Sequence, residues 1–162
     1  MVERRTSPDR TTCRTPRREG PAVPATAAWR IALPHTAAAV PMARALVRTA
    51  LNDAGAPADP DTAELLTAEL VANAVEHTLA GAPIELAVEL RADGCQVEVH
   101  DGDPRLPGGL AAASRDAHHP DPWQEHGRGL LLIRSLSSGC GHRRTEGGKA
   151  VWFTLHRRPA AV

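Results

Sequence analysis

Hydrophobic and polar residues alternate along several short stretches of the chain, as they do in half-buried β-strands. The alternation is strict over residues 84–90 and returns over 95–100, and an Asp93-Gly94 pair suited to a tight turn lies between them. These two stretches are therefore expected to form a hairpin. Shorter patterns of the same kind predict three further strands, at residues 28–33, 141–145 and 150–156.

Three other stretches carry apolar residues at helical spacing. The first is expected to run from residue 37 to about 53, with Thr36 as its N-cap and Gly55 just beyond its end. The second carries residues 69–78, has Asp61 or Thr62 as its N-cap and is closed by glycine and proline. The third begins at residues 127–129 and ends before Gly139.

The order of these elements is strand, two helices, hairpin, long loop, helix and hairpin. This order predicts an α+β fold, a two-layer α/β sandwich with a mixed sheet and helices on one face. The domain is expected to span residues 26–158, followed by a short C-terminal tail at 159–162. Residues 1–25 are rich in Arg, Thr and Pro and have little to bury, so a disordered tail is expected there.

Composition and charge exclude several function classes. Apolar residues make up 42% of the chain, which is enough for a core, and 19 basic residues balance 19 acidic ones, so no overall field favours nucleic acid. No apolar run is long enough to span a membrane or to serve as a signal peptide. Three widely spaced cysteines make a disulfide framework or a zinc site unexpected and fit a reducing compartment, so a cytoplasmic protein is predicted.

Three polar side chains share one stripe of the second helix. Glu69, Asn73 and His77 fall within a narrow arc at 100° per residue, and apolar residues cover the rest of the surface. One interpretation is a solvated helix face. The other is a site where the glutamate takes a proton and the asparagine offers an oxygen to a hard cation such as Mg²⁺.

Two glycine-bearing motifs favour the second interpretation. Asp101 ends a strand and is followed by Gly102, where a carboxylate can accept from an exocyclic amine such as that of adenine. Gly127-Arg128-Gly129 begins a helix, where free backbone N–H groups and the helix dipole favour phosphate. The Walker-type loop and the dinucleotide fingerprint are both absent. A cluster of potential ligands in the long loop lacks the ordered spacing of zinc sites, and no metal is expected at His118, His119, Asp121, Glu125 and His126.

Taken in order and spacing, these motifs resemble those of the GHKL ATPases, the gyrase, histidine kinase and MutL relatives, and most of all the bacterial anti-sigma-factor serine kinases. The stretch at 69–77 looks like the asparagine box of that family, Asp101-Gly102 like its first glycine box and Gly127-Arg128-Gly129-Leu130 like its second. Gly148-Lys149 stands where the closing strand of the family begins. Many relatives have a threonine after that glycine and an Asp-x-Gly first box, whereas here Lys149 follows Gly148 and Asp103 follows Gly102.

The resemblance implies the Bergerat, or histidine-kinase-like ATPase, fold and a role for each matching residue. Glu69 would be the general base, and Asn73 would coordinate a Mg²⁺ ion that bridges the phosphates. Asp101 would accept the adenine amine. His77 would lie near the phosphates or pack as an ordinary helix residue.

The remaining motif residues would bind the nucleotide or offset charge. The backbone of the second glycine box, from Gly127 through Arg128 and Gly129 to Leu130, would receive phosphates, and loop 103–126 would be the ATP lid. Lys149 could offset the charge of Asp103 or be solvated.

The implied function is an ATP-dependent regulator. The chain would transfer the γ-phosphoryl group of Mg·ATP to a serine of a small anti-sigma-factor antagonist and would sequester a sigma factor, as a homodimer. One alternative is a non-catalytic module of the same fold that acts by partner capture alone. A sensor histidine kinase is disfavoured, because residues 1–27 hold no histidine.

Overall fold

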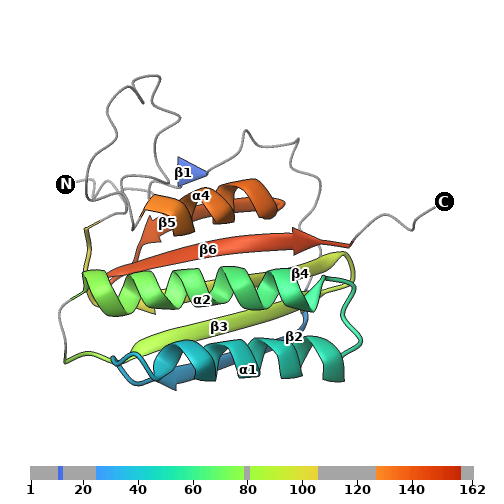
Figure 1. Cartoon of the computed structure of the whole chain (residues 1–162), viewed down its shortest axis with the longest axis horizontal. Helices are drawn as coiled ribbons and strands as arrows, with labels where there is room; N and C mark the ends of the chain where they lie inside the picture. Colours follow the sequence, from blue (N-terminus) through green and yellow to red (C-terminus); the bar gives the residue numbers. More distant parts are fainter. Residues whose placement is uncertain (1–10, 13–24, 79–80, 106–126, 158–162) are drawn as a thin grey trace, which may run out of the picture.

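The fold is a six-stranded antiparallel sheet with helices on one face, as a computed structural model of the chain shows (Figure 1). The structure describes residues 11–12, 25–78, 81–105 and 127–157. The strands are β1 (Thr11–Thr12), β2 (Ala25–Leu33), β3 (Ile84–Arg91), β4 (Gly94–Asp101), β5 (Gly139–Arg144) and β6 (Lys149–His156). Their order in the sheet is β1-β5-β6-β4-β3-β2. The predicted two-layer α/β sandwich is therefore confirmed.

The expectation of a mixed sheet is wrong in one respect, because every pairing between the described strands is antiparallel. Two helices separate β2 from β3, so the chain crosses the sheet twice before β3 begins, and β3 runs opposite to β2. A single helix separates β4 from β5, and these two strands do point the same way. They do not pair, because β6 is inserted between them.

The helices are α1 (Ala39–Asp53), α2 (Pro60–His77) and α4 (Gly127–Leu136). Figure 1 shows α1 and α2 side by side in front of β2, β3 and β4, with α4 nearer to β5. The buried stripe of α1 repeats every four residues at Ala43, Val47 and Leu51. It packs with Leu66 and Leu70 of α2 in one continuous core above the sheet.

The two long helices begin near the predicted residues but with other caps. Helix α1 begins at Ala39, and Thr36 contributes a backbone carbonyl to its first turn instead of a side-chain cap. Helix α2 begins at Pro60, with Asp59 as its N-cap. Proline is favoured at this position because its missing N–H would have no helical partner there.

Part of the segment expected to be a tail belongs to the sheet. Thr11 and Thr12 pair with β5, and Ala25 is the first residue of β2, so the tail interpretation of residues 1–25 is wrong at these residues. Backbone groups at a sheet edge pair regardless of side-chain polarity, which composition does not reveal. The other residues of that segment lie outside the described part of the chain.

The cysteines and the apolar character of the helices can be compared with what the composition predicted. Cys95 is a buried free thiol, and burial raises its pKa to about 11, whereas Cys140 is disulfide-bonded, which the cysteine spacing did not indicate. Among the described residues, no helix has the length and apolar character needed to cross a membrane.

The sheet face that points away from the helices is polar. Glu98 accepts hydrogen bonds from Arg143 through both carboxylate oxygens, at 2.7 and 2.8 Å, and lies 2.9 Å from His100 Nε2. Burial by itself raises the pKa of Glu98, but the hydrogen bonds and charges of His100 and Arg143 outweigh it and hold the pKa well below its usual range. This network stabilises the sheet on the side opposite the candidate site.

Candidate functional site

Asp101 and Lys149 form a buried ion pair at the ends of β4 and β6. The antiparallel register places the two residues directly opposite each other. Lys149 Nζ donates to Asp101 Oδ1 at 3.0 Å and to the backbone carbonyl of Asp103 at 3.1 Å. Both residues are more than nine-tenths buried, at 8% and 6% exposure. Lys149 therefore compensates Asp101. Its charge also helps to lower the pKa of Asp103, which agrees with the expected offset, whereas the alternative of a solvated Lys149 is wrong because the side chain is buried.

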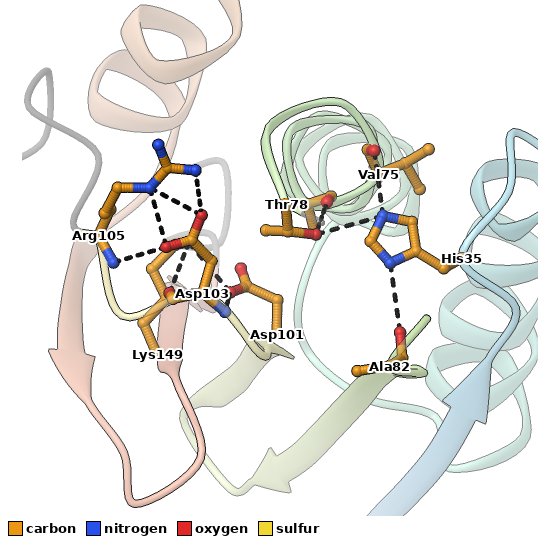
Figure 2. A network of polar contacts seen from close by, with 9 residues as sticks. His35, Val75, Thr78, Ala82, Asp101, Asp103, Arg105 and Lys149 are labelled. Carbon is orange, nitrogen blue, oxygen red and sulfur yellow. Dashed lines mark hydrogen bonds and ion pairs between the residues drawn. The ribbon is translucent and has the colours of Figure 1, made fainter. Parts of the chain in front are cut away.

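The Asp103 carboxylate is compensated by a neighbour that sequence reasoning missed. Arg105 donates to it from its backbone N–H and its side chain, with Nη2 at 2.6 Å from Oδ2 (Figure 2). These hydrogen bonds from Arg105 lower the pKa of Asp103 well below its usual range. The backbone N–H of Asp103 donates in turn to Asp101 Oδ1 at 2.9 Å. The two carboxylates thus share one turn without an unpaired negative charge.

Glycine at position 148 permits this close arrangement. A Cβ there would overlap the backbone carbonyl of Asp101 and lie 2.8 Å from the carbonyl carbon of Gly102. Backbone atoms of a paired strand cannot move aside, so any side chain at this position would push β6 away from β4. Gly102 itself is exposed beside the turn.

Glu69 and Asn73 lie in the middle of α2, and Glu69 lies next to the beginning of α4. A Cβ on Gly129 would overlap a carboxylate oxygen of Glu69 and lie 3.2 Å from its Cδ, so the Glu69 side chain rests against the glycine backbone. Helices α2 and α4 pack against each other here. Within the described part of the chain, neither Glu69 nor Asn73 makes a side-chain hydrogen bond or an ion pair. Two polar groups on one stripe are therefore available to a ligand.

The other predicted site residues occupy the surroundings of this stripe. His77 is exposed by 53% at its side chain and lies 3.9 Å from Glu76, and Leu130 packs partly buried against the core. Gly127 and Arg128 begin α4, and their side-chain surroundings lie outside the described residues, as does the predicted lid beyond Arg105. Within the described residues the first turn of α4 carries no acidic residue of its own, and the Glu69 carboxylate of α2 lies against it.

A histidine that the sequence did not indicate holds the C-terminal end of α2. His35 Nε2 lies 3.2 Å from both the Val75 carbonyl and Thr78 Oγ1, and Nδ1 lies 3.2 Å from the Ala82 carbonyl. Figure 2 shows this group on the α2 side and the Asp101 group on the sheet side. His35 thus ties the last turn of α2 to the segment that leads into β3, opposite the Asp101 turn.

The family model of the histidine kinase-like ATPase domain matches residues 33–155. The chain belongs to this family. The match extends from the end of β2 to within β6 and includes all the motifs described above. No curated protein sequence matches the chain. Membership of the histidine kinase-like ATPases implies ATP binding. It also supports the GHKL superfamily, which the motifs resemble.

The residues of this histidine kinase-like ATPase domain fit ATP and Mg²⁺. The Asn73 amide supplies an oxygen ligand of the kind that Mg²⁺ prefers, and the Glu69 carboxylate, which rests against Gly129, is placed to take a proton. Asp101 Oδ2 accepts no hydrogen bond from the described residues, which leaves one acceptor for a base amine. Among the described residues no group of His, Cys, Asp and Glu side chains could form a protein-only metal site. The loop histidines considered earlier lie outside the described residues.

Proposed function

We propose that this histidine kinase-like ATPase domain is an ATP-dependent protein serine kinase of the anti-sigma-factor type. The observation that carries the proposal is that Glu69 and Asn73, one turn apart on α2, make no side-chain hydrogen bond or ion pair with the described residues, while Glu69 lies beside the N-terminal turn of α4. Both side chains are half-buried, so water can satisfy them in the absence of a ligand and a bound ligand can replace that water. A role in binding and proton transfer leaves them open until the ligand arrives.

Each residue has one role in the proposed reaction. Asp101 accepts the adenine amine, Asn73 holds Mg²⁺, and the N-terminal backbone of α4 receives the phosphates. Glu69 takes the proton of a serine hydroxyl, whose oxygen bonds to the γ-phosphorus while the bond from that phosphorus to the β,γ-bridging oxygen breaks. Phosphoserine and ADP are the products. Positioning and charge neutralisation supply most of the catalysis in such transfers.

The proposed partners follow the resemblance in the motifs. The phosphoryl acceptor is a serine of a small antagonist protein, the sequestered partner is a sigma factor, and the chain acts as a homodimer in the cytoplasm. The balance of 19 basic and 19 acidic residues fits partners that are proteins, without direct contact to nucleic acid or membrane.

The experiment compares Glu69→Ala with Asn73→Ala. Glu69→Ala is expected to bind Mg·ATP within about threefold of wild type and to lose phosphoryl transfer, because a general base acts in the transition state and little in the ground state. Asn73→Ala is expected to lose the Mg²⁺-dependent part of the affinity as well. Titrations with ATP, with and without Mg²⁺, and transfer of radiolabelled phosphate to antagonist proteins measure the two effects.

Two results would contradict the proposal. Equal loss of ATP binding in both variants would place Glu69 in ground-state binding instead of proton transfer. Wild-type protein that binds no nucleotide would remove the site assignment and leave only the fold.

A second candidate, a non-catalytic partner-capture module, is favoured by one observation. The Lys149 ammonium already occupies one oxygen of Asp101, the carboxylate expected to accept the adenine amine. If the module acts by capture alone, the wild type binds a sigma factor without labelling any antagonist, and Glu69→Ala leaves that capture unchanged.

A further inference from the structure

The buried ion pair between Asp101 and Lys149 has bonding capacity left over. Lys149 has three N–H donors, and two of them are used, on Asp101 Oδ1 and on the Asp103 carbonyl. The third finds no acceptor among the described residues, and Asp101 Oδ2 receives no donor from them. The adjoining ends of β4 and β6 thus present an unused N–H donor beside an unused carboxylate acceptor.

A charged pair is an unusual choice for a purely structural contact here. A buried ion pair seldom stabilises a fold more than apolar residues of similar volume, because both charges lose their hydration. The pair at 101 and 149 is nonetheless held by strand register and by Gly148, which brings the two strands together at this level. The arrangement is rigid, and rigid placement of polar groups is what base recognition requires.

We propose that Lys149 is a second base-reading residue, which donates its third N–H to ring nitrogen N1 of adenine while Asp101 Oδ2 accepts the neighbouring amine. The inference rests on the proposed ATP binding and deepens it, because it assigns a specificity role to the residue that pairs with Asp101. Adenine presents a donor and an acceptor side by side on this edge. Guanine in the same pose presents an oxygen to Asp101 and an N–H to Lys149, so both contacts are repulsive.

The test uses an ATP analogue that lacks only the proposed contact. In 1-deaza-ATP the N1 atom is replaced by C–H, and the amine, sugar and phosphates are retained. Wild-type protein is expected to bind ATP at least about 10-fold more tightly than 1-deaza-ATP, since hydrogen bonds to charged groups are strong when buried. GTP is expected to bind more weakly than either.

The variant Lys149→Met keeps about the length of the side chain and removes its N–H donors. It is titrated with the same two nucleotides as the wild type. The variant is expected to bind ATP only as tightly as the wild type binds 1-deaza-ATP. Its own affinities for ATP and 1-deaza-ATP are expected to be nearly equal. The control is Arg144→Met, because Arg144 is an exposed cation that pairs with Lys149 in the β5–β6 register. Its preference for ATP is expected to match that of the wild type.

The outcomes separate this inference from the proposed function. Wild type that binds ATP and 1-deaza-ATP equally overturns the role of Lys149 and leaves ATP binding standing. Wild type that binds neither overturns ATP binding and the inference with it. ATP binding that appears only in Lys149→Met would show that the ion pair blocks the base, which also overturns the inference. If Lys149→Met does not fold, the two wild-type affinities still decide.

Discussion

The two ends of the candidate site are built in opposite ways. At the base end, Asp101 is paired with Lys149, Asp103 is paired with Arg105, and the first pair is buried. At the phosphate end, Glu69 and Asn73 make no side-chain hydrogen bond within the described residues. The base end is thus part of the fold, whereas the phosphate end is left for the ligand to complete. Substitutions at the two ends are expected to separate stability from function.

The largest loss of stability is expected at the base end from Asp101→Asn. The variant leaves the Lys149 ammonium buried without its counter-charge, which costs about 3 kcal/mol of unfolding free energy. Urea unfolding followed by circular dichroism measures the change. The control is the double variant Asp101→Asn with Lys149→Met, which is expected to recover a large part of the loss. A single variant as stable as wild type would show that the pair contributes nothing to the fold.

Gly148→Ala should disturb the same end by about 2–3 kcal/mol, because a Cβ there overlaps the backbone of the paired strand. The neighbouring Gly147 provides a matched control, since nothing lies within 4 Å of a Cβ built on it. Gly147→Ala is expected to change the unfolding free energy by less than about 0.5 kcal/mol. Equal stabilities of the two variants, measured by the same urea unfolding, would contradict the close approach of β4 and β6.

The network of Glu98, His100 and Arg143 lies outside both ends of the site and is expected to affect stability alone. Because the folded pKa of Glu98 lies below its ordinary value, the ionised carboxylate stabilises the fold above that value, and the contribution is lost as the pH falls. Glu98→Gln should therefore lower stability by about 1–3 kcal/mol near neutral pH and flatten the decline of the melting temperature below about pH 4.5. ATP affinity should not change. Parallel pH profiles for the two proteins would contradict this assignment.

The smallest effect on stability is expected at the phosphate end. Glu69→Gln and Asn73→Ala remove no protein hydrogen bond within the described part of the chain, so the unfolding free energy should stay within about 0.5 kcal/mol of wild type. Thermal unfolding without nucleotide gives the comparison, and wild type with ATP is the reference for ligand stabilisation. A buried hydrogen-bond network contributes about 2 kcal/mol or more. A loss of unfolding free energy of that size would show that the phosphate end is structural too.

The fold could be predicted from local patterns, whereas the pairing at the base end could not. The β3–β4 hairpin follows from strict alternation and a two-residue turn, and α4 ends where Gly139 indicated. The partner of Lys149 depends on the β4–β6 register, which joins residues 48 positions apart. The sequence suggested that Lys149 offsets the charge of Asp103, but the hydrogen-bonded ion pair forms with Asp101, which lies directly opposite Lys149 in that register. The contacts of His35 with α2 were missed for the same reason, because they join residues 40 or more positions apart.

The position of β6 also determines when the sheet can fold during synthesis of the chain. β6 is the last of the described strands to leave the ribosome, yet it lies between β4 and β5 in the interior of the sheet. Until it arrives, the nascent chain holds two open strand edges, and Asp101 has no cation opposite it. Folding of the whole sheet must therefore wait until β6 has been synthesised, and nucleotide can stabilise only a chain whose translation has passed Lys149.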